Sequence, residues 1–348
     1  MNKKLILPLM IIVVALILIL IFLIGSFQPD KKTEIVIGFQ PSTHQAAAMV
    51  AAEKGWWEED LKQFGIDHVE LKKFASGPPE MEALQYGSID VAYTGSAPVL
   101  SHLYEGMDAK IVSAVQIQGS GLVVRSELAK EYTGPESLKG LVIATYPPGS
   151  IQYTVLTKWL LDNGLDPKRD VSIKDMSPAD AVSALAYNHV DAVFLPSPHP
   201  EIAQRQGSGV IVEWSGDMWQ NHACCCLAVS EELINDHPEI VEQIVKTHIK
   251  ATEYAKDHPD EVASIISRWI GVDEGIVSQS IRESDMEWIY DPYRQVESVE
   301  KYAEVTYDLN KDRYERRGYK LLKEQDIFDF TFYNKVIYAS EKNERENK

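Results

Sequence analysis

The chain has 348 residues, a formal net charge of −18 and 45% hydrophobic residues. This length and composition allow a large core divided between two lobes, and the acidic surface argues against nucleic acid or anionic lipid as a partner. The only cysteines, Cys224 to Cys226, are consecutive, so they cannot form a framework of disulfides between distant loops.

The chain begins with an apolar segment. Residues 5–24 are interrupted only by Pro8, and a helix of this length rises roughly 30 Å, the thickness of the hydrocarbon core of a bilayer. Lys3 and Lys4 precede the segment, so the positive-inside rule leaves the N-terminus in the cytoplasm and the rest of the chain outside. No clear small-residue cleavage site follows it. The pattern predicts an uncleaved, single-pass transmembrane anchor within residues 1–26, with a cleaved signal as the alternative.

After a short polar linker, strand-like and helix-like runs alternate, which is typical of an α/β protein. Strands are expected at residues 35–39, 69–74, 91–93, 141–145 and 192–195. Helices are expected to end near Lys54, Leu84 and Asn163, and Ser177 to Asp180 has the spacing of a capping box.

The C-terminal third is helical in character. Residues 239–255 form an amphipathic pattern that begins after Pro238, and residues 260–322 remain rich in charged and aromatic side chains. We expect a last packed element at residues 328–338 and a disordered tail at 341–348.

Small polar residues gather in the turns that follow strands and precede helices. In open α/β sheets this edge binds ligands, and helix N-termini there present unpaired N–H groups to anions. Each turn taken alone is also explained by ordinary turn and capping chemistry. The turns are Gln40–His44, Ser76–Pro79, Thr94–Pro98, Tyr146–Ser150, Ser177–Asp180 and Pro196–His199.

Several of these turns, in this order, resemble one known family. The matching segments are Ile37–Gln40, Phe74–Leu84, Gly87–Pro98, Leu138–Gly140, Pro148–Ser150, Ser177–Asp180 and Val190–Ala192. Together they resemble the ABC-transporter solute-binding proteins for aliphatic sulfonates, taurine and nitrate. The resemblance covers nearly all of residues 34–260.

The resemblance implies an α/β fold of the type II periplasmic-binding-protein class, in which two lobes with mixed sheets hold a ligand between them. The first lobe is expected to comprise residues 33–116 and 229–340, and the second lobe residues 117–228. Two crossovers would join the lobes, near residues 118–121 and 226–228.

This fold class also implies partners. A small anionic solute would close the lobes by a hinge motion, and an ABC permease with its ATPase would recognise the closed form. The resemblance places sulfonates first among the solutes, followed by nitrate-like or bicarbonate-like anions. It implies a binding protein without a cofactor, not an enzyme.

Neutral donors suit such a solute, because several hydroxyl and backbone N–H groups in a dry cleft hold an anion without a full counter-charge. The resemblance and the turns together predict a set of ligand-binding residues. They are Gln40, Ser42, His44, Ser76, Gly77, Thr94, Gly95, Ser96, Gln118, Gly149, Ser150, Ser197 and His199.

One loop departs from the family pattern. Relatives carry an aromatic residue, an acidic residue and proline where this chain has Leu195 to His199. A carboxylate there could recognise an amino group, so its absence weakens a taurine-like assignment. It leaves His199 as an additional donor.

The three cysteines lie in a segment that looks like a strand, where Cys224 and Cys226 would face one side and Cys225 the other. The simplest interpretation is three small apolar side chains. A metal site formed by His222, Cys224 and Cys226 is the alternative.

The cysteines also resemble part of a motif in a related branch, the enzymes that build the thiamin pyrimidine. Those enzymes need a pyridoxal-bearing lysine, and neither Lys54 nor Lys62 stands in a matching motif. Other catalytic signatures are absent from the sequence. A second alternative is a pyrimidine-binding protein, with Tyr146, Trp214 and Trp219 as stacking faces.

Overall fold

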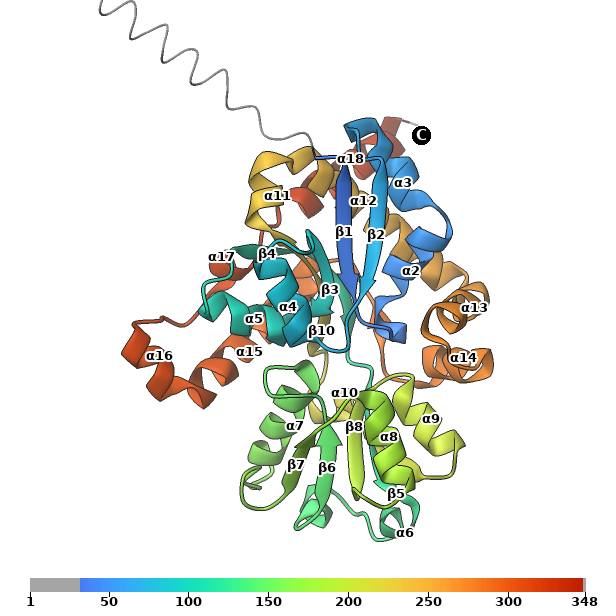
Figure 1. Ribbon diagram of the computed structural model, residues 1–348, viewed down its shortest axis with the longest axis vertical. Coiled ribbons are helices and arrows are strands. Elements are labelled where there is room, and N and C mark those ends of the chain that lie inside the picture. Colours follow the sequence, from blue (N-terminus) through green and yellow to red (C-terminus); the bar gives the residue numbers. More distant parts are fainter. Residues whose placement is uncertain (1–31, 347–348) are drawn as a thin grey trace, which may run out of the picture. The chain divides into compact units, whose positions relative to one another are not determined.

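The computed structural model describes residues 32–346, and two mixed β-sheets organise these residues from Glu34 onward (Figure 1). The expected anchor within residues 1–26 lies outside the described part of the chain. Between residues 32 and 346, no helix has both the length and the apolar character that a membrane span requires.

The first sheet has six strands in the order β11-β4-β10-β3-β1-β2. β1 is parallel to β2 and β3, whereas β10 is antiparallel to β3 and β4. The bounds are β1 (Glu34–Phe39), β2 (His68–Lys73), β3 (Val91–Gly95), β4 (Ala109–Ile117), β10 (Ala223–Ser230) and β11 (Glu287–Trp288).

The second sheet has five strands in the order β7-β6-β8-β5-β9. Its strands β6, β7 and β8 are parallel to one another, β5 is antiparallel to β8, and β9 is antiparallel to β5. The bounds are β5 (Ser120–Arg125), β6 (Val142–Thr145), β7 (Ser172–Asp175), β8 (Ala192–Pro196) and β9 (Gly209–Trp214).

Helices cover both sheets, and we define the first and second lobes as the first and second sheets with the helices that pack on them. In the first lobe, α4 packs against β3 and α5 against β10, while α12 packs against α2 and α18. The first-lobe helices are α2 (Ala46–Glu53), α3 (Trp56–Leu61), α4 (Gly77–Gln85), α5 (Ser96–Tyr104), α11 (Glu231–Asp236), α12 (Pro238–Asp257), α13 (Pro259–Ile270), α14 (Glu274–Glu283), α15 (Val296–Leu309), α16 (Lys311–Arg317), α17 (Glu324–Ile327) and α18 (Thr331–Glu346).

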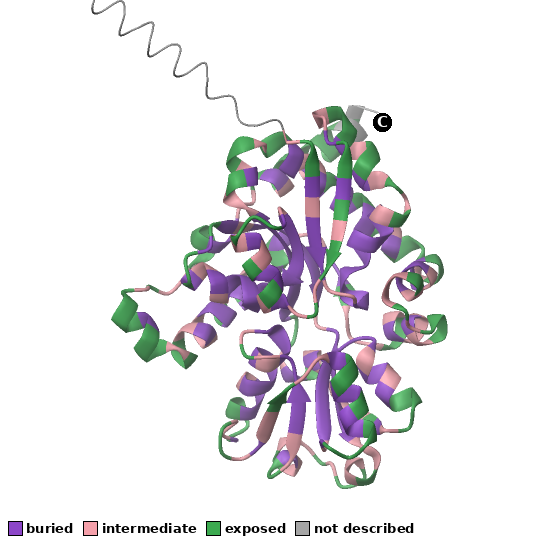
Figure 2. Ribbon diagram, in the orientation of Figure 1, coloured by how far each residue is buried: buried purple, intermediate pink, exposed green. Residues whose placement is uncertain are grey.

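In the second lobe, α7, α8 and α9 pack against β8. The helices are α6 (Ser126–Ala129), α7 (Ile151–Asp162), α8 (Pro178–Ala186), α9 (His199–Arg205) and α10 (Ser215–Met218). Both lobes also contain short 3₁₀ helices, which are η1 (Thr43–Gln45), η2 (Lys62–Phe64), η3 (Pro135–Leu138) and η4 (Pro292–Gln295). Most of β3, β8 and β10 is buried (Figure 2).

Several expected boundaries are confirmed. The Ser177 hydroxyl accepts a hydrogen bond from the Asp180 backbone and begins α8, and the amphipathic pattern after Pro238 forms α12. The expected tail from residue 341 is wrong as far as Glu346, because α18 continues to that residue. An ion pair between Glu341 and Arg345, one helical turn apart, favours this continuation.

The chain crosses between the sheets at Gln118–Gly119 and returns through residues 219–222. The first crossover lies where the sequence predicts it. The second lies before the cysteines, not at residues 226–228, because β10 is a central strand of the first sheet. Residues 223–228 therefore belong with the first sheet and not with the second.

Asp285 holds the first crossover in place. Its carboxylate accepts hydrogen bonds from the backbone N–H groups of Gly119 at 2.7 Å and Gly216 at 2.5 Å. Gly119 has a φ of +84°, and a Cβ there would lie 2.8 Å from His44 Nε2. The crossover thus needs a residue without a side chain at this point.

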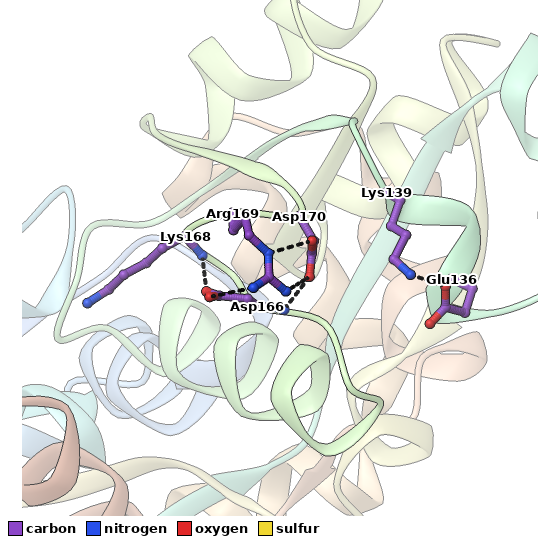
Figure 3. A network of polar contacts seen from close by, with 6 residues as sticks. All are labelled: Glu136, Lys139, Asp166, Lys168, Arg169 and Asp170. Atoms are coloured by element: carbon purple, nitrogen blue, oxygen red, sulfur yellow. Dashed lines mark hydrogen bonds and ion pairs between the residues drawn. The ribbon is translucent and has the colours of Figure 1, made fainter.

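A network of charged side chains lies at the surface of the second lobe, in the segments that precede β6 and β7 (Figure 3). The Asp170 carboxylate accepts hydrogen bonds from the Asp166 backbone and the Arg169 guanidinium, at 2.8 Å and 3.1 Å. The Asp170 carbonyl accepts from the Gly140 backbone, so this network ties the loop before β7 to the loop before β6. Such exposed ion pairs contribute little to stability.

The two lobes touch at Thr43 and Ser197. The Thr43 hydroxyl donates to the Ser197 carbonyl oxygen at 3.1 Å, and the Ser197 hydroxyl donates to the Glu201 carboxylate at 2.8 Å. Glu201 is 1% exposed, and burial raises its pKa to about 7. This interlobe contact therefore stands next to a carboxyl group that titrates near neutral pH.

We predict that Glu201→Gln becomes more stable relative to the unsubstituted protein as pH rises. Between about pH 4.5 and 7 the unfolded chain has released the Glu201 proton that the native protein still holds, so native stability falls through this window. Glutamine has no such proton. Unfolding followed in urea at several pH values should give a relative gain of up to about 3 kcal/mol by pH 8. A difference that stays constant with pH would contradict this assignment.

Candidate functional site

A cavity of about 20 Å³ lies between the lobes, which is room for about one water molecule. The first lobe contributes Gln40, Ser42, His44, Gln45, Gly77, Gly95, Pro98, Cys224 and Cys225. The second lobe contributes Tyr146, Ser150, Ile151, Gln152 and Pro196. An organic solute of several heavy atoms does not fit this cavity as the lobes stand.

The cavity lies at the carboxyl ends of parallel strands, as expected for open α/β sheets. Gln40 follows β1, Gly95 ends β3, Tyr146 follows β6 and Pro196 ends β8. These strand ends come from both sheets, so the carboxyl edges of the two sheets meet at the cavity.

Three helices begin at the cavity. Gly77 starts α4, Gly95 is the N-cap of α5, and Ser150 is the N-cap of α7, with its hydroxyl accepting a hydrogen bond from the Tyr153 backbone at 3.2 Å. Helix N-termini carry partial positive charge and unpaired N–H groups. The described lining includes neither lysine nor arginine, so the positive potential at this cavity is that of the helix N-termini, with neutral donors beside them.

Gly95 permits the close approach of the lobes. A Cβ at this position would lie 2.8 Å from Ile151 Cγ1, in the first turn of α7. Real Cβ atoms do not approach a carbon atom this closely, so any larger residue would separate the edges.

One buried carboxyl group, that of Glu80, lies beside the cavity lining. Gln40 Nε2 donates to Glu80 Oε2 at 2.7 Å and to Thr94 Oγ1 at 3.4 Å. Glu80 is fully buried, and this burial raises its pKa well above the ordinary value. This direction favours the neutral acid, which carries no negative charge to repel an anion.

His44 and two cysteines form the floor of the cavity. Cys224 Sγ lies 3.4 Å from His44 Nδ1 and 3.8 Å from Cys225 Sγ. The expected alternation of the cysteines is wrong, because β10 shifts register against β4 between Ala223 and Cys225 and again after Cys225. Such a bulge re-aims side chains, and here it brings the thiols of adjacent residues together.

The thiols have different electrostatic environments. The hydrogen bond with Cys224 lowers the pKa of Cys225, and burial raises the pKa of Cys224. His222, which was expected to join the cysteines as a metal ligand, instead bonds to the Tyr302 hydroxyl at 2.8 Å. Neither His222 nor Cys226 belongs to the group that His44 forms with Cys224 and Cys225.

The structure brings part of the predicted ligand set together at the cavity, namely Gln40, Ser42, His44, Gly77, Gly95 and Ser150. The remaining predicted residues do not line it: Ser76, Thr94, Ser96, Gln118, Gly149, Ser197 and His199. Gln118 serves the crossover, with its side chain bonded to the Asp285 carbonyl and the Asn221 backbone. Burial lowers the pKa of His199 to about 4, and its Nδ1 faces the Pro196 carbonyl at 3.3 Å.

The pyrimidine alternatives gain no support from the cavity. Lys54 pairs with Glu261 at the surface, and Lys62 is exposed. Tyr146 lines the cavity, but Trp214 and Trp219 do not. Several residues that line the cavity were not among the predicted ligand-binding residues, although most of them lie in or within a few positions of a predicted turn. They are Gln45, Pro98, Ile151, Gln152, Pro196, Cys224 and Cys225.

In a comparison with known protein families, residues 28–271 of the chain match the model of the NMT1-like family. The chain belongs to the NMT1-like family. This NMT1-like protein is 27% identical over 320 residues to an aliphatic sulfonates-binding protein of Bacillus subtilis, covering 90% of this chain and 91% of that protein.

Two further proteins are similar over large parts of the chain. A nitrate import ATP-binding protein of Synechocystis is 24% identical over 268 residues, which are 71% of this chain but only 39% of that protein. The crystal structure of the periplasmic nitrate-binding protein of Synechocystis superposes with a TM-score of 0.74 at 18% identity, covering 88% of this chain and 89% of that one. This superposition shows that the two proteins share the two-lobed α/β fold.

We predict that Ser150→Ala lowers the free energy of unfolding by about 1 kcal/mol, because the first turn of α7 loses its capping oxygen. Urea denaturation measures this cost. Ser177→Ala removes the equivalent cap of α8 outside the cavity and should cost a similar amount. An unchanged midpoint for Ser150→Ala would mean that its hydroxyl does not cap α7.

Proposed function

We propose that this chain is the extracytoplasmic solute-binding component of an ABC importer and that its interlobe cavity captures the head group of a small anion. The observation that carries the proposal is the convergence of three helix N-termini, from α4, α5 and α7, on one cavity lined by neutral donors. Each terminus stabilises negative charge, and together they surround an anion from both lobes.

The solute class follows from this chemistry and from the relatives. Sulfonate, nitrate and bicarbonate all present oxygen atoms that accept hydrogen bonds from hydroxyl and backbone N–H groups. The relative with the greatest overlap among those described above is named for aliphatic sulfonates, and this supports sulfonates as the first class to test. Nitrate and bicarbonate come next.

The proposed partners are a permease and its ATPase, which would distinguish the closed from the open arrangement of the lobes. We propose further that residues 5–24 anchor the chain in the cell membrane. Their apolar composition behind Lys3 and Lys4 supports this proposal.

Calorimetric titration of the purified protein with methanesulfonate, nitrate and bicarbonate tests the solute class. We expect at least one of these anions to bind, and the neutral analogue methanesulfonamide to bind more weakly. Ser150→Ala should lower the affinity for that anion roughly tenfold, because one of the helix starts around it is disordered by loss of the cap. Ser177→Ala, with an equal loss of a cap elsewhere, should bind normally.

Two results would refute the proposed anion site. One is equal weakening of binding by Ser150→Ala and Ser177→Ala, which would place the anion elsewhere. The other is preferential binding of an uncharged pyrimidine over all of the anions.

We also predict that Gly95→Ala weakens binding of the same anion at least tenfold, because the added methyl group meets Ile151 and opposes closure. Gly87→Ala is the matched control. Its φ is +69° with open space around it, so the substitution strains the turn after α4 without touching the cavity. Calorimetric affinities unchanged by Gly95→Ala would contradict the closing of the lobes over the solute.

A further inference from the structure

Within residues 32–346, one group of histidine, cysteine or acidic side chains places three ligand atoms within 4.8 Å of one another, and it consists of His44, Cys224 and Cys225. All three residues are buried, at 2%, 1% and 5% exposure. They line the interlobe cavity, and the two cysteines also belong to the main hydrophobic core.

The separations of the three atoms match those that a tetrahedral metal ion imposes. Bonds of about 2.3 Å to sulfur and 2.0–2.1 Å to nitrogen place two sulfur ligands about 3.8 Å apart, and sulfur and nitrogen about 3.6 Å apart. Here the two sulfur atoms lie 3.8 Å apart, and His44 Nδ1 lies 3.4 Å and 4.0 Å from them. One ion can therefore contact all three atoms with only small side-chain movements.

The surroundings prepare His44 as a ligand. Its Nε2 lies 2.7 Å from the Gly119 carbonyl oxygen, which can only accept, so Nε2 carries the proton and Nδ1 presents its lone pair to the sulfurs. Histidines that bind metals are oriented by such a bond from the other ring nitrogen. The Gln45 amide donates to Cys225 Sγ at 3.8 Å and would support a thiolate there.

The bulge in β10 is what makes the group possible. In a regular strand, the side chains of Cys224 and Cys225 would point to opposite faces. The register shifts around Cys225 place both thiols on the cavity side. The fourth tetrahedral position then faces the cavity, which has room for one water molecule or one donor atom of a solute.

We propose that His44, Cys224 and Cys225 bind one thiophilic metal ion, Zn²⁺ or Cu⁺, at the floor of the interlobe cavity. Thiolate and imidazole ligands favour these ions, whereas Mg²⁺ and Ca²⁺ require oxygen ligands. Each thiol releases its proton when the metal binds, so affinity falls as pH falls. The site does not depend on the proposed transport of an anion.

Equilibrium dialysis of the reduced, full-length protein against buffered Zn²⁺, with metal counted by atomic spectroscopy, tests the proposal. We expect one Zn²⁺ per chain, and at least a hundredfold weaker binding for Cys224→Ala and for Cys225→Ala. Cys226→Ala is the matched control, because this buried thiol belongs to the same strand but not to the group. It should bind Zn²⁺ within about threefold of the unsubstituted protein. Anaerobic competition with Cu⁺ distinguishes the two ions, and Mg²⁺ should not compete.

A spectroscopic measurement on the unsubstituted protein guards against variants that fail to fold. Co²⁺ in place of Zn²⁺ should give sulfur-to-cobalt charge-transfer absorption and the intense visible bands of tetrahedral cobalt. Absence of this absorption together with no stoichiometric Zn²⁺ would overturn the proposal. So would equal loss of Zn²⁺ in Cys226→Ala and Cys225→Ala. Failure here leaves the anion titrations unaffected, because they are made without added metal.

Discussion

The arrangement of the site depends on Asp285, which comes from the C-terminal third of the chain and holds the first crossover in place. Asp285 accepts hydrogen bonds from the backbones of Gly119 and Gly216, one at the crossover and one near the end of the second lobe. Bonds between a carboxylate and backbone N–H groups are stronger than bonds between neutral groups. The Gly119 carbonyl oxygen, which can only accept, in turn orients the His44 ring through its Nε2.

The electrostatics of the cavity follow from burial. A chain with a net charge of −18 holds its proposed anion site without a lysine or arginine among the described lining residues. Instead, helix N-termini supply partial positive charge, and burial raises the pKa of Glu80 and Glu201 so that their neutral forms are favoured.

Local features of this structure, such as turns and helix starts, could be predicted from the sequence. The turns around Thr94–Pro98 and Tyr146–Ser150 were placed correctly, because strand, small residue and helix start follow one another within a few positions. The family resemblance supplied the two-lobed architecture, including the first crossover. The prediction that Gln40, His44, Gly95 and Ser150 share one cleft between the lobes rests on this resemblance, and all four line the cavity.

What the sequence could not provide depends on distant strands. The second crossover was misplaced because nothing local shows that β10 enters the first sheet between β3 and β4. The orientation of the cysteines was wrong for the same reason, since the bulge arises from register against β4, about a hundred residues earlier in the chain. Asp285 lies in a stretch that read only as helical and charged, and its partners are far away in sequence.

Solution X-ray scattering with and without a saturating concentration of the tightest-binding anion tests most directly whether a solute closes the lobes. A two-lobed protein that closes over its solute becomes more compact, so the radius of gyration should decrease on binding, and it should decrease less for Gly95→Ala at equal occupancy. An identical radius of gyration with the anion bound and unbound would mean that the solute does not draw the two sheet edges together.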